Sequence, residues 1–371
     1  MRVSMHSTSV PFDLVIPMSG LNASGEVRLV IHVANALAAR RRGVAFVVPA
    51  HAATPPIDLH TRIQVITRGS ALGMRGRFAF GDMPRARVYL ATGYQTALLI
   101  ARSRPRANPK ARIVHLIQSD EITTHIRLGS QRTWLKPMLH SVARRGLEVD
   151  AIRIAVSRAV ADAVGRDRIH RIINPGIDAR YIQNASQATP ARRERRHDHP
   201  EKLTVGFFAQ SGRAKGTAVA IEGLARFADL ETVRFVAFDR GGPLLPTFVE
   251  RFSVIQGDRA MDPMAFYNTC DIFVFPALVE GFGLPPLEAM ACGVACAISD
   301  CGGVREYAHP EKNCLMFNPG DSPALAHAIE RLMNDGALRS WLGAAGRDTA
   351  VQFPVEKFAS ACADEIEAAL V

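Results

Sequence analysis

The stretch DIFVFPALVEGFGLPPLEAMACGVACAIS, from Asp271 to Ser299, shows in order the patterns of a strand, a loop, a helix and a second strand. Its apolar runs DIFVFPAL and VACAIS are short and do not alternate with polar residues, as expected of strands covered on both faces. Between them, PPLEAMACG begins with prolines and ends with a glycine, which is typical of a short helix. Strands that alternate with helices favour a mostly parallel sheet, so the stretch predicts an α/β fold.

The same alternation continues on both sides of this stretch. Toward the N-terminus, we expect an amphipathic helix that Ser24 caps, and strands at residues 12–18, 44–49, 63–67, 87–92, 111–117 and 153–157. After a polar, basic and proline-containing segment, the pattern restarts with a strand at 203–209, a helix at 217–227, a strand at 233–239 and a helix at 261–270. Late helices are expected at 323–334, 337–351 and 355–370.

The restart predicts two domains, which also fits 371 residues at about 100–200 residues per domain. We expect one Rossmann-like, doubly wound domain over residues 1–185, a linker over 186–202 and a second such domain over 203–354. A C-terminal helix over 355–371 is expected to pack back on the first domain. Two doubly wound sheets that face each other create a ligand cleft at the carboxyl ends of their strands.

Charge points to an anionic partner. The formal net charge is +10 and the pI is about 9.7, which favours nucleic acid, acidic lipid or a phosphorylated substrate. The basic residues concentrate in segments 102–112, 131–145 and 191–198. No nucleic-acid-binding motif and no basic strand with interleaved aromatic residues is present, so nucleic acid is not an expected partner.

Three features of the sequence concern the compartment of the protein. The first twelve residues contain no apolar signal-peptide core, and no stretch reaches the roughly 18 apolar residues of a membrane helix. None of the six cysteines forms a C-x-x-C pair, and their apolar neighbours predict small core residues of a reduced compartment. We expect a cytoplasmic protein, with attachment to a membrane surface left open.

Glu280 and Glu288 are the two carboxylates of the opening stretch, and apolar residues surround both. Gly281 and Gly283 let the loop between them bend and approach a ligand closely. The amides at the following helix start attract anions. Carboxylates that accept hydrogen bonds from hydroxyls, beside amides that bind phosphate, complement a sugar nucleotide. The alternative is structural: Glu280 ends a strand, and Glu288 stabilises a helix N-terminus.

The segment EGFGLPPLEAMACGVACAISDCGGVREYA resembles the E-x7-E signature of the retaining GT-B glycosyltransferases of family 4, the glycosyl transferases group 1. VSRAV, INPGID and YNTCDIFVFPALVEGFG are similar to other segments of this group, so the resemblance covers most of the chain. It implies a GT-B fold of two Rossmann-like domains. In such a fold the N-terminal domain binds the acceptor and the C-terminal domain binds the nucleotide sugar.

The resemblance implies a role for each matching residue. Glu280 should accept hydrogen bonds from the hydroxyls of the donor sugar, and Glu288 should accept them from the hydroxyls of the ribose. The donor-binding loop comprises Gly281, Phe282, Gly283 and Leu284, and the amides of its last three residues should face the sugar and phosphate.

The segment AQSGRAKGTA contains a second matching element, Arg213 and Lys215. They resemble the cation pair that binds the donor diphosphate in this group. Cations and helix-start amides stabilise the charge that develops on the leaving nucleotide diphosphate. The spacing between the two residues is shorter than usual, which favours Lys215 over Arg213. The chain has no Asp-x-Asp pair, so we expect no metal requirement and no cofactor.

The N-terminal domain matches the group less closely. Gly20 and Gly25 lie in SGLNASGE, which resembles the glycine-rich loop after the first strand that approaches phosphate or acceptor. Many relatives have a histidine past the end of the strand that here is ARIVHLI, where this chain has Gln118. His115, three residues earlier, either faces the cleft or is a core histidine. Asp120 and Glu121 are further candidate acceptor contacts.

The segment TWLKPMLHSVARRGL, residues 133–147, mixes apolar and basic residues. Its apolar residues are Trp134, Leu135, Met138, Leu139 and Val142, and its basic residues include Lys136, Arg144 and Arg145. Such a segment can lie on an anionic membrane surface. The alternative is an ordinary amphipathic helix packed on the N-terminal domain, and Pro137 argues against one uninterrupted helix.

These features predict a retaining glycosyltransferase that moves a hexose or deoxyhexose from a nucleotide diphosphate sugar. The acceptor is expected to be a saccharide or a lipid-linked saccharide in bacterial surface polysaccharide or glycolipid synthesis. The chain shows no nucleophile for a double displacement, so a front-side attack is the expected mechanism. The alternatives are another GT-B enzyme, such as a nucleotide-sugar epimerase or phosphorylase, and a non-catalytic sugar-nucleotide-binding protein.

Overall fold

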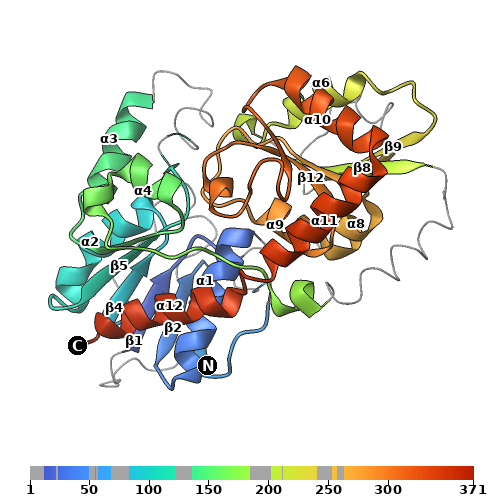
Figure 1. Cartoon of the computed structure of the whole chain (residues 1–371). Helices are drawn as coiled ribbons and strands as arrows, with labels where there is room; N and C mark the ends of the chain where they lie inside the picture. The colour runs from blue at the N-terminus through green and yellow to red at the C-terminus, as the bar shows by residue number, and fades with distance from the viewer. Residues whose placement is uncertain are drawn as a thin grey trace.

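The computed structural model contains two parallel sheets with helices on their faces (Figure 1). It describes residues 12–21, 24–49, 55, 57–67, 83–121, 123, 136–183, 202–210, 212–239, 253–256 and 263–371. Trp134, Leu135 and the basic segment 191–198 lie outside the described residues, as does the predicted linker apart from residue 202.

The first sheet has the strand order β3-β2-β1-β4-β5-β6-β7, with every neighbouring pair parallel. Its strands are β1 Phe12–Pro17, β2 Val44–Val48, β3 Ile63–Thr67, β4 Ala86–Ala91, β5 Arg112–Ile117, β6 Ile152–Ala155 and β7 Arg171–Ile172. The order reverses between β1 and β4, and doubly wound sheets bind their ligands at such a switch point.

The second sheet repeats this design with the order β10-β9-β8-β11-β12-β13, again with parallel pairs. Its strands are β8 Leu203–Ala209, β9 Val233–Asp239, β10 Ser253–Gln256, β11 Ile272–Phe275, β12 Ala295–Ser299 and β13 Leu315–Phe317. Here the order reverses between β8 and β11. The predicted α/β class and the two doubly wound sheets are confirmed.

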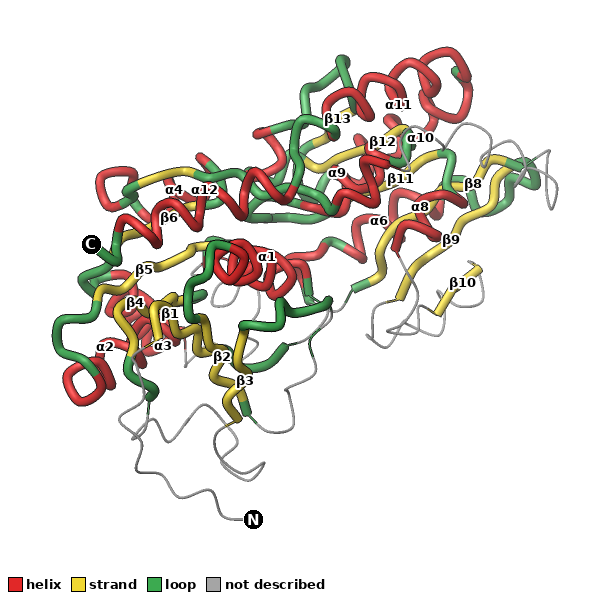
Figure 2. The backbone as a smooth tube through the Cα atoms, turned by 90° about the horizontal axis from the view of Figure 1, so that it is seen from below, coloured by secondary structure: helices red, strands yellow, loops and turns green. Residues whose placement is uncertain are grey.

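Helices cover both faces of the first sheet. Helices α1 (Gly25–Ala39) and α12 (Val355–Ala368) lie side by side on one face, and α2 (Tyr94–Ala107) and α3 (Lys136–Leu147) lie on the other (Figures 1 and 2). The other helices are α4 Arg158–Val164, α6 Thr217–Ala225, α8 Pro263–Thr269, α9 Leu284–Ala291, α10 Ser322–Asn334 and α11 Gly336–Ala350.

The last helix of the chain returns to the first sheet. Arg40, at the end of α1, donates hydrogen bonds to Asp364 at 2.6 Å and Glu367 at 2.8 Å. Arg42 donates to the same Glu367 at 2.6 Å. These charged contacts are at least partly exposed to water. They add to the apolar packing of α12 on α1, which buries Phe358 and Ile366. The C-terminal segment thus ties the two sheets together.

Several element boundaries follow from local sequence. Strands β3, β8 and β9 have the predicted bounds, because each is a short, largely apolar run. The Ser24 side chain accepts a hydrogen bond from the Val27 amide and caps α1, as predicted. The short strands β7, β10 and β13 and the helices α2 and α4 lack such a strong pattern, and the sequence did not predict them.

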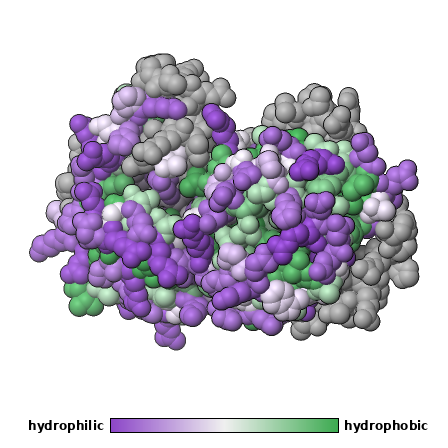
Figure 3. All heavy atoms as spheres, turned by 45° about the horizontal axis from the view of Figure 1, so that its top comes forward, coloured by the Kyte–Doolittle hydropathy of each residue, from purple (hydrophilic) through white to green (hydrophobic). Residues whose placement is uncertain are grey.

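The interior and the surface fit the composition. All six cysteines are buried and none forms a disulfide, which confirms the prediction of core residues. On the face in Figure 3, hydrophilic side chains surround small apolar areas, as is normal for a globular surface. Among the described residues, the longest apolar helices fall short of what would be needed to cross a bilayer.

Candidate active site

A cavity of about 340 Å³ lies between the two sheets. It is found at the carboxyl ends of three strands, because Gln118 follows β5, Gln210 follows β8 and Pro276 follows β11. Its polar lining comes from both halves of the chain and includes Ser24, Glu26, Arg28, Gln118, Gln210, Lys215, Glu280 and Glu288. The position agrees with the predicted cleft.

Glu280 follows β11 and is fixed through its backbone. Its amide donates to the Cys301 carbonyl at 3.0 Å, and its carbonyl accepts from the Gly303 amide at 3.1 Å. Its carboxylate oxygen Oε1 is 2.5 Å from Nζ of Lys215. Burial lowers the pKa of Lys215, but the charge of Glu280 and the hydrogen bond to it outweigh burial and raise this pKa. The cleft therefore contains an ammonium group beside a carboxylate.

Lys215 ends a single-turn 3-10 helix, Arg213–Lys215, that precedes α6. The next residue, Gly216, has φ +68°, and a Cβ there would lie 1.8 Å from the Pro276 carbonyl oxygen. Only glycine permits this close approach of the lysine turn to the end of β11. Arg213 lies in the same turn, but its side chain is exposed and does not line the cleft. The structure thus brings Lys215, but not Arg213, to the cavity.

Glu288 lies in α9 and is 7% exposed. The Tyr267 hydroxyl donates a hydrogen bond to its Oε2 at 2.9 Å. Nη1 of Arg28, which belongs to α1 of the first sheet, lies 3.7 Å from its Oε1. A buried carboxylate requires such partners to offset its loss of hydration. Both oxygens of Glu288 are therefore oriented within the wall of the cavity.

The loop between the two glutamates packs tightly against the first sheet. A Cβ on Gly281 would lie 1.9 Å from the Gln118 carbonyl oxygen. The Gly281 carbonyl accepts a hydrogen bond from the Ser157 hydroxyl at 2.5 Å, across the two halves of the chain. The Gly283 carbonyl accepts from the Tyr307 hydroxyl at 2.5 Å. Both carbonyls are therefore hydrogen-bonded to protein groups, which anchors the loop at the cleft.

The start of α9 offers free backbone donors. Gly283 is its N-cap residue with φ +86°, and prolines follow in the first turn. Phe282, Gly283 and Leu284 line the cavity, and over the described part of the chain their amides donate no hydrogen bond. Unsatisfied amides at a helix start form a site for an anion.

On the side of the first sheet, Gln118 faces the cleft. Its Nε2 donates to the Glu26 carbonyl at 3.3 Å, and its buried Oε1 has no partner in the described structure. Gly25 opens α1 and also lines the cavity, where a Cβ would lie 3.3 Å from Leu284. Gly20 is buried and does not line the cavity. Of the two predicted loop glycines, the structure brings Gly25 to the site.

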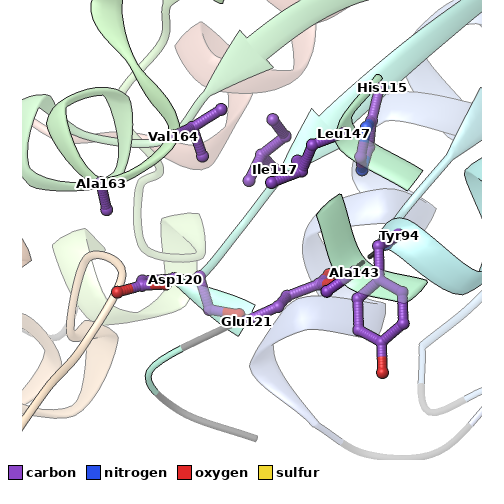
Figure 4. Close-up of a pocket in the computed structure, with 10 residues that line it drawn as sticks. Tyr94, His115, Ile117, Asp120, Glu121, Ala143, Leu147, Ala163 and Val164 are labelled. Atoms are coloured by element: carbon purple, nitrogen blue, oxygen red, sulfur yellow. Dashed lines mark hydrogen bonds between the residues drawn. The ribbon is translucent and has the colours of Figure 1, made fainter. Parts of the chain in front are cut away.

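His115 does not reach the cleft. It is 1% exposed, and both of its ring nitrogens lack a hydrogen-bond partner among the described residues. Burial, with a smaller contribution from the charge of Arg153, lowers its pKa to about 3. Its side chain projects from β5 toward a separate cavity of about 10 Å³ (Figure 4). Successive residues of a strand point to opposite faces, and the face of His115 is the one that α2 and α3 cover.

Glu121 lines the same small cavity and has a structural role. Its Oε2 accepts a hydrogen bond from the Tyr94 amide at 2.9 Å, at the first turn of α2 (Figure 4). Burial raises its pKa to about 7, although this hydrogen bond acts in the opposite direction. Asp120 also lines the small cavity and accepts from the Thr123 amide at 3.1 Å. Neither side chain lines the large cleft.

Sequence reasoning missed four side chains that contact the segment from Glu280 to Glu288: Arg28, Ser157, Tyr267 and Tyr307. Ser157 carries a signal, since it lies in VSRAV and its hydroxyl also accepts from the Val160 amide as the N-cap of α4. Nothing local distinguishes Arg28 from the other arginines around α1. Among the described residues, no group of three or more His, Cys, Asp or Glu side chains has the arrangement of a metal site.

Comparison with known families agrees with this geometry. A family model described as Glycosyl transferases group 1 matches residues 250–349, which include both glutamates and the loop between them. Residues 250–349 thus match the group 1 glycosyltransferase family, and the fold of the chain is the GT-B fold.

Two curated relatives illustrate the extent of similarity. The serotype-specific mannosyltransferase WbdA of Escherichia coli is 46% identical over 76 residues, which cover 20% of this chain and 9% of that protein. The lipopolysaccharide core biosynthesis mannosyltransferase LpsB of Rhizobium meliloti is 30% identical over 210 residues, which cover 52% of this chain and 59% of that protein. The chain spans less than two thirds of the length of either relative.

Solved structures support the fold over nearly the whole chain. Sucrose-phosphate synthase from Thermosynechococcus elongatus has a TM-score of 0.76 at 20% identity, and covers 96% of this chain and 98% of its own. HepE from Anabaena, solved in complex with UDP-glucose, has a TM-score of 0.70 at 16% identity. The match covers 96% of this chain and 100% of the HepE chain.

Proposed function

We propose that this chain transfers a hexose or deoxyhexose from a nucleotide diphosphate sugar to a saccharide or lipid-linked saccharide, with retention of the anomeric configuration. The observation that carries the proposal is one cavity of about 340 Å³ with two carboxylates, an ammonium group and the unpaired amides of a helix start. These groups match the hydroxyls and the diphosphate of a sugar nucleotide.

Each group has a place in the proposed reaction. Glu280 accepts hydrogen bonds from the hydroxyls of the donor sugar, and Glu288 accepts them from the hydroxyls of the ribose. Lys215 and the amides of Phe282, Gly283 and Leu284 stabilise the charge that develops on the diphosphate as the glycosidic bond breaks. The acceptor hydroxyl attacks from the same face, and a donor phosphate oxygen takes its proton. We propose that this charge stabilisation works without a metal ion.

Surface polysaccharide or glycolipid synthesis is the proposed setting. Two of the relatives are mannosyltransferases, one serotype-specific and one of lipopolysaccharide core biosynthesis. We propose that the acceptor is lipid-linked and that the protein acts at the cytoplasmic face of a membrane, with α3 as the contact.

The exposed face of α3 supports this placement. Met138 is 56% exposed, and Arg144 and Arg145 are exposed on the same helix. Leu139 and Val142 pack inward against Tyr94 and Ala143. Pro137 occupies the second position of α3, which a proline tolerates, so the helix is uninterrupted from Lys136 to Leu147. Co-sedimentation with anionic vesicles, but not with zwitterionic ones, is expected, and reversing both arginine charges should abolish it.

The central experiment is a thermal-shift screen against UDP, GDP, dTDP and ADP sugars. A bound donor raises Tm by mass action, and the best donor then enters transfer assays with saccharide acceptors. Addition of a chelator should leave transfer unchanged. The proposal fails if no nucleotide stabilises the protein.

The same assays separate the two alternatives. A nucleotide-sugar epimerase or a phosphorylase would turn over the donor without an acceptor saccharide or would use phosphate. A non-catalytic sugar-nucleotide-binding protein would be stabilised by a nucleotide but would show neither transfer nor donor hydrolysis.

A further inference from the structure

Arg28 reaches across the cleft from α1 toward α9. Its Nη1 lies 3.7 Å from Oε1 of Glu288, and the two side chains are only 15% and 9% exposed. Arg28 also lines the large cavity. This contact joins a helix of the first sheet to the carboxylate that we assign to the ribose.

Asp178 holds Arg28 in this position. Nη2 of Arg28 forms an ion pair with Oδ2 of Asp178, which Nε of Arg180 also approaches at 3.6 Å. The other oxygen, Oδ1, is 2.7 Å from Nε2 of His32. Burial, and then the charge of Arg28, lower the pKa of His32, so the ring is neutral and donates one hydrogen bond. Because Asp178 binds Nη2 of Arg28, the other terminal nitrogen, Nη1, points toward Glu288.

Glu288 is therefore contacted from both halves of the chain. Tyr267 donates to Oε2 from the same half, and Arg28 faces Oε1 from the other half. A carboxylate has about four lone-pair sites, and Glu288 lines the cavity in which the ribose hydroxyls would bind. At 3.7 Å the Arg28 contact is an ion pair without a direct hydrogen bond, so a hydroxyl can bind to Oε1 without breaking one.

We propose that Arg28 is a positioning residue that couples closure of the cleft to recognition of the ribose by Glu288. The inference rests on the proposed function, because Glu288 has this ligand only if the cleft binds a nucleotide. Arg28 and Glu288 meet only when the two halves are as close as they are here. A nucleotide that requires the oriented carboxylate therefore favours the closed arrangement.

Calorimetric titration with a ribonucleoside diphosphate tests this role. The probe is whichever of UDP, GDP and ADP binds the wild type best, together with its 2′,3′-dideoxy form. In Arg28→Ala, we expect Kd for the natural probe to rise about tenfold or more. The dideoxy form should bind the wild type and the variant with nearly equal affinity, because it lacks the hydroxyls through which Arg28 acts.

Two further variants complete the experiment. Arg158→Ala is the matched control, because Arg158 also forms an ion pair between the two halves, with Glu306 at 3.2 Å, but does not line the cleft. It should bind both probes like the wild type. Arg28→Gln, which is closer in size to arginine, should repeat the result of Arg28→Ala. Because loss of the Asp178 ion pair can lower Tm, all titrations are made well below the Tm of each variant, and equal binding of the dideoxy probe shows that the cleft is folded.

The possible failures are distinguishable. If the wild type binds none of these three nucleotides and does not bind dTDP, the proposed function itself is wrong. If the wild type binds one and the Arg28 variants bind it within twofold, only the inference is overturned. Equal losses for the natural and dideoxy probes would also overturn it, because Arg28 would then act on another part of the nucleotide.

Discussion

Strands β5 and β11 end on opposite sides of the same cleft, and the segments that follow them are built differently. After β11, the Glu280 backbone makes two hydrogen bonds to the 301–303 turn, and its carboxylate pairs with Lys215. After β5, Gln118 makes one long hydrogen bond at 3.3 Å and leaves a buried oxygen without a described partner.

The difference assigns the two sides of the cleft different tasks. A fixed array of charges and amides after β11 suits the stabilisation of charge on a leaving group, because no reorganisation is needed during reaction. Buried polar atoms normally have partners, so the unpaired oxygen of Gln118 is available to a ligand that enters between the sheets. Under the proposed function, the preformed array after β11 is the expected donor site, and the open positions after β5 are the expected acceptor site.

The largest expected effect is on Lys215. Lys215→Ala should lower the transfer rate by about 10³-fold, because it removes a preorganised cation from the diphosphate position. Arg213→Ala, in the same turn but exposed, should cost at least tenfold less. Initial rates at saturating donor provide the measurement, and equal losses in both variants would contradict the assignment of Lys215 as the cleft cation.

Two glycine variants test where the loop after β11 is held. In Gly281→Ala, the new Cβ meets Gln118 of the other half of the chain, so closure is blocked and kcat should fall about hundredfold. In Gly216→Ala, the clash and the positive φ lie within one half, so folding is destabilised by about 2 kcal/mol or more. Thermal unfolding distinguishes them: Tm should drop in Gly216→Ala and change little in Gly281→Ala.

Glu288 should affect binding more than chemistry. Glu288→Ala is expected to raise the nucleotide Kd by about tenfold or more, because hydrogen bonds to a carboxylate contribute about 1.5–3 kcal/mol. Tyr267→Phe leaves the carboxylate in place but removes the donor to its Oε2, so a smaller loss is expected. Calorimetric titration of both variants checks this order, and a wild-type Kd in Glu288→Ala would refute the donor assignment.

The smallest expected effects concern the cavity behind β5. His115, with its pKa lowered to about 3, contributes stability above its unfolded pKa of 6.5 that is lost as the pH falls below it. Glu121, with its pKa raised to about 7, contributes stability below its unfolded pKa of 4.5 that is lost as the pH rises through 7. Between pH 4.5 and 6.5 the two slopes oppose each other.

Single variants should reveal each slope. In Glu121→Gln, the unfolding free energy should fall on acidification from pH 6.5 to 4.5, by up to about 1.4 kcal/mol per pH unit relative to the wild type. In His115→Leu, it should fall as the pH rises over the same interval. Urea unfolding at three pH values measures both, and identical pH slopes in all three proteins would show that neither group titrates as described.

The sequence predicted the second sheet and its site well. Glu280, the glycines and Glu288 lie on one continuous strand, loop and helix, so their spacing alone constrains where they meet. For the first sheet, the sequence predicted the architecture and named Gly25 and Gln118, which line the cleft, but it also named Gly20 and His115, which do not. His115 and Gln118 are three residues apart, and only the packing of α2 and α3 on one face of β5 decides that Gln118 faces the cleft.

By itself, the sequence indicated the alternation of strands and helices, and through it the two parallel sheets, because each element has its own residue pattern. It also indicated the loop with two carboxylates, whose residues are close together along the chain. Only the tertiary structure decided which groups meet across the cleft. Ser157 binds Gly281, and Arg28 faces Glu288, although long segments separate each pair in the sequence. Such contacts depend on how two sheets pack, and no local spacing or periodicity encodes that packing.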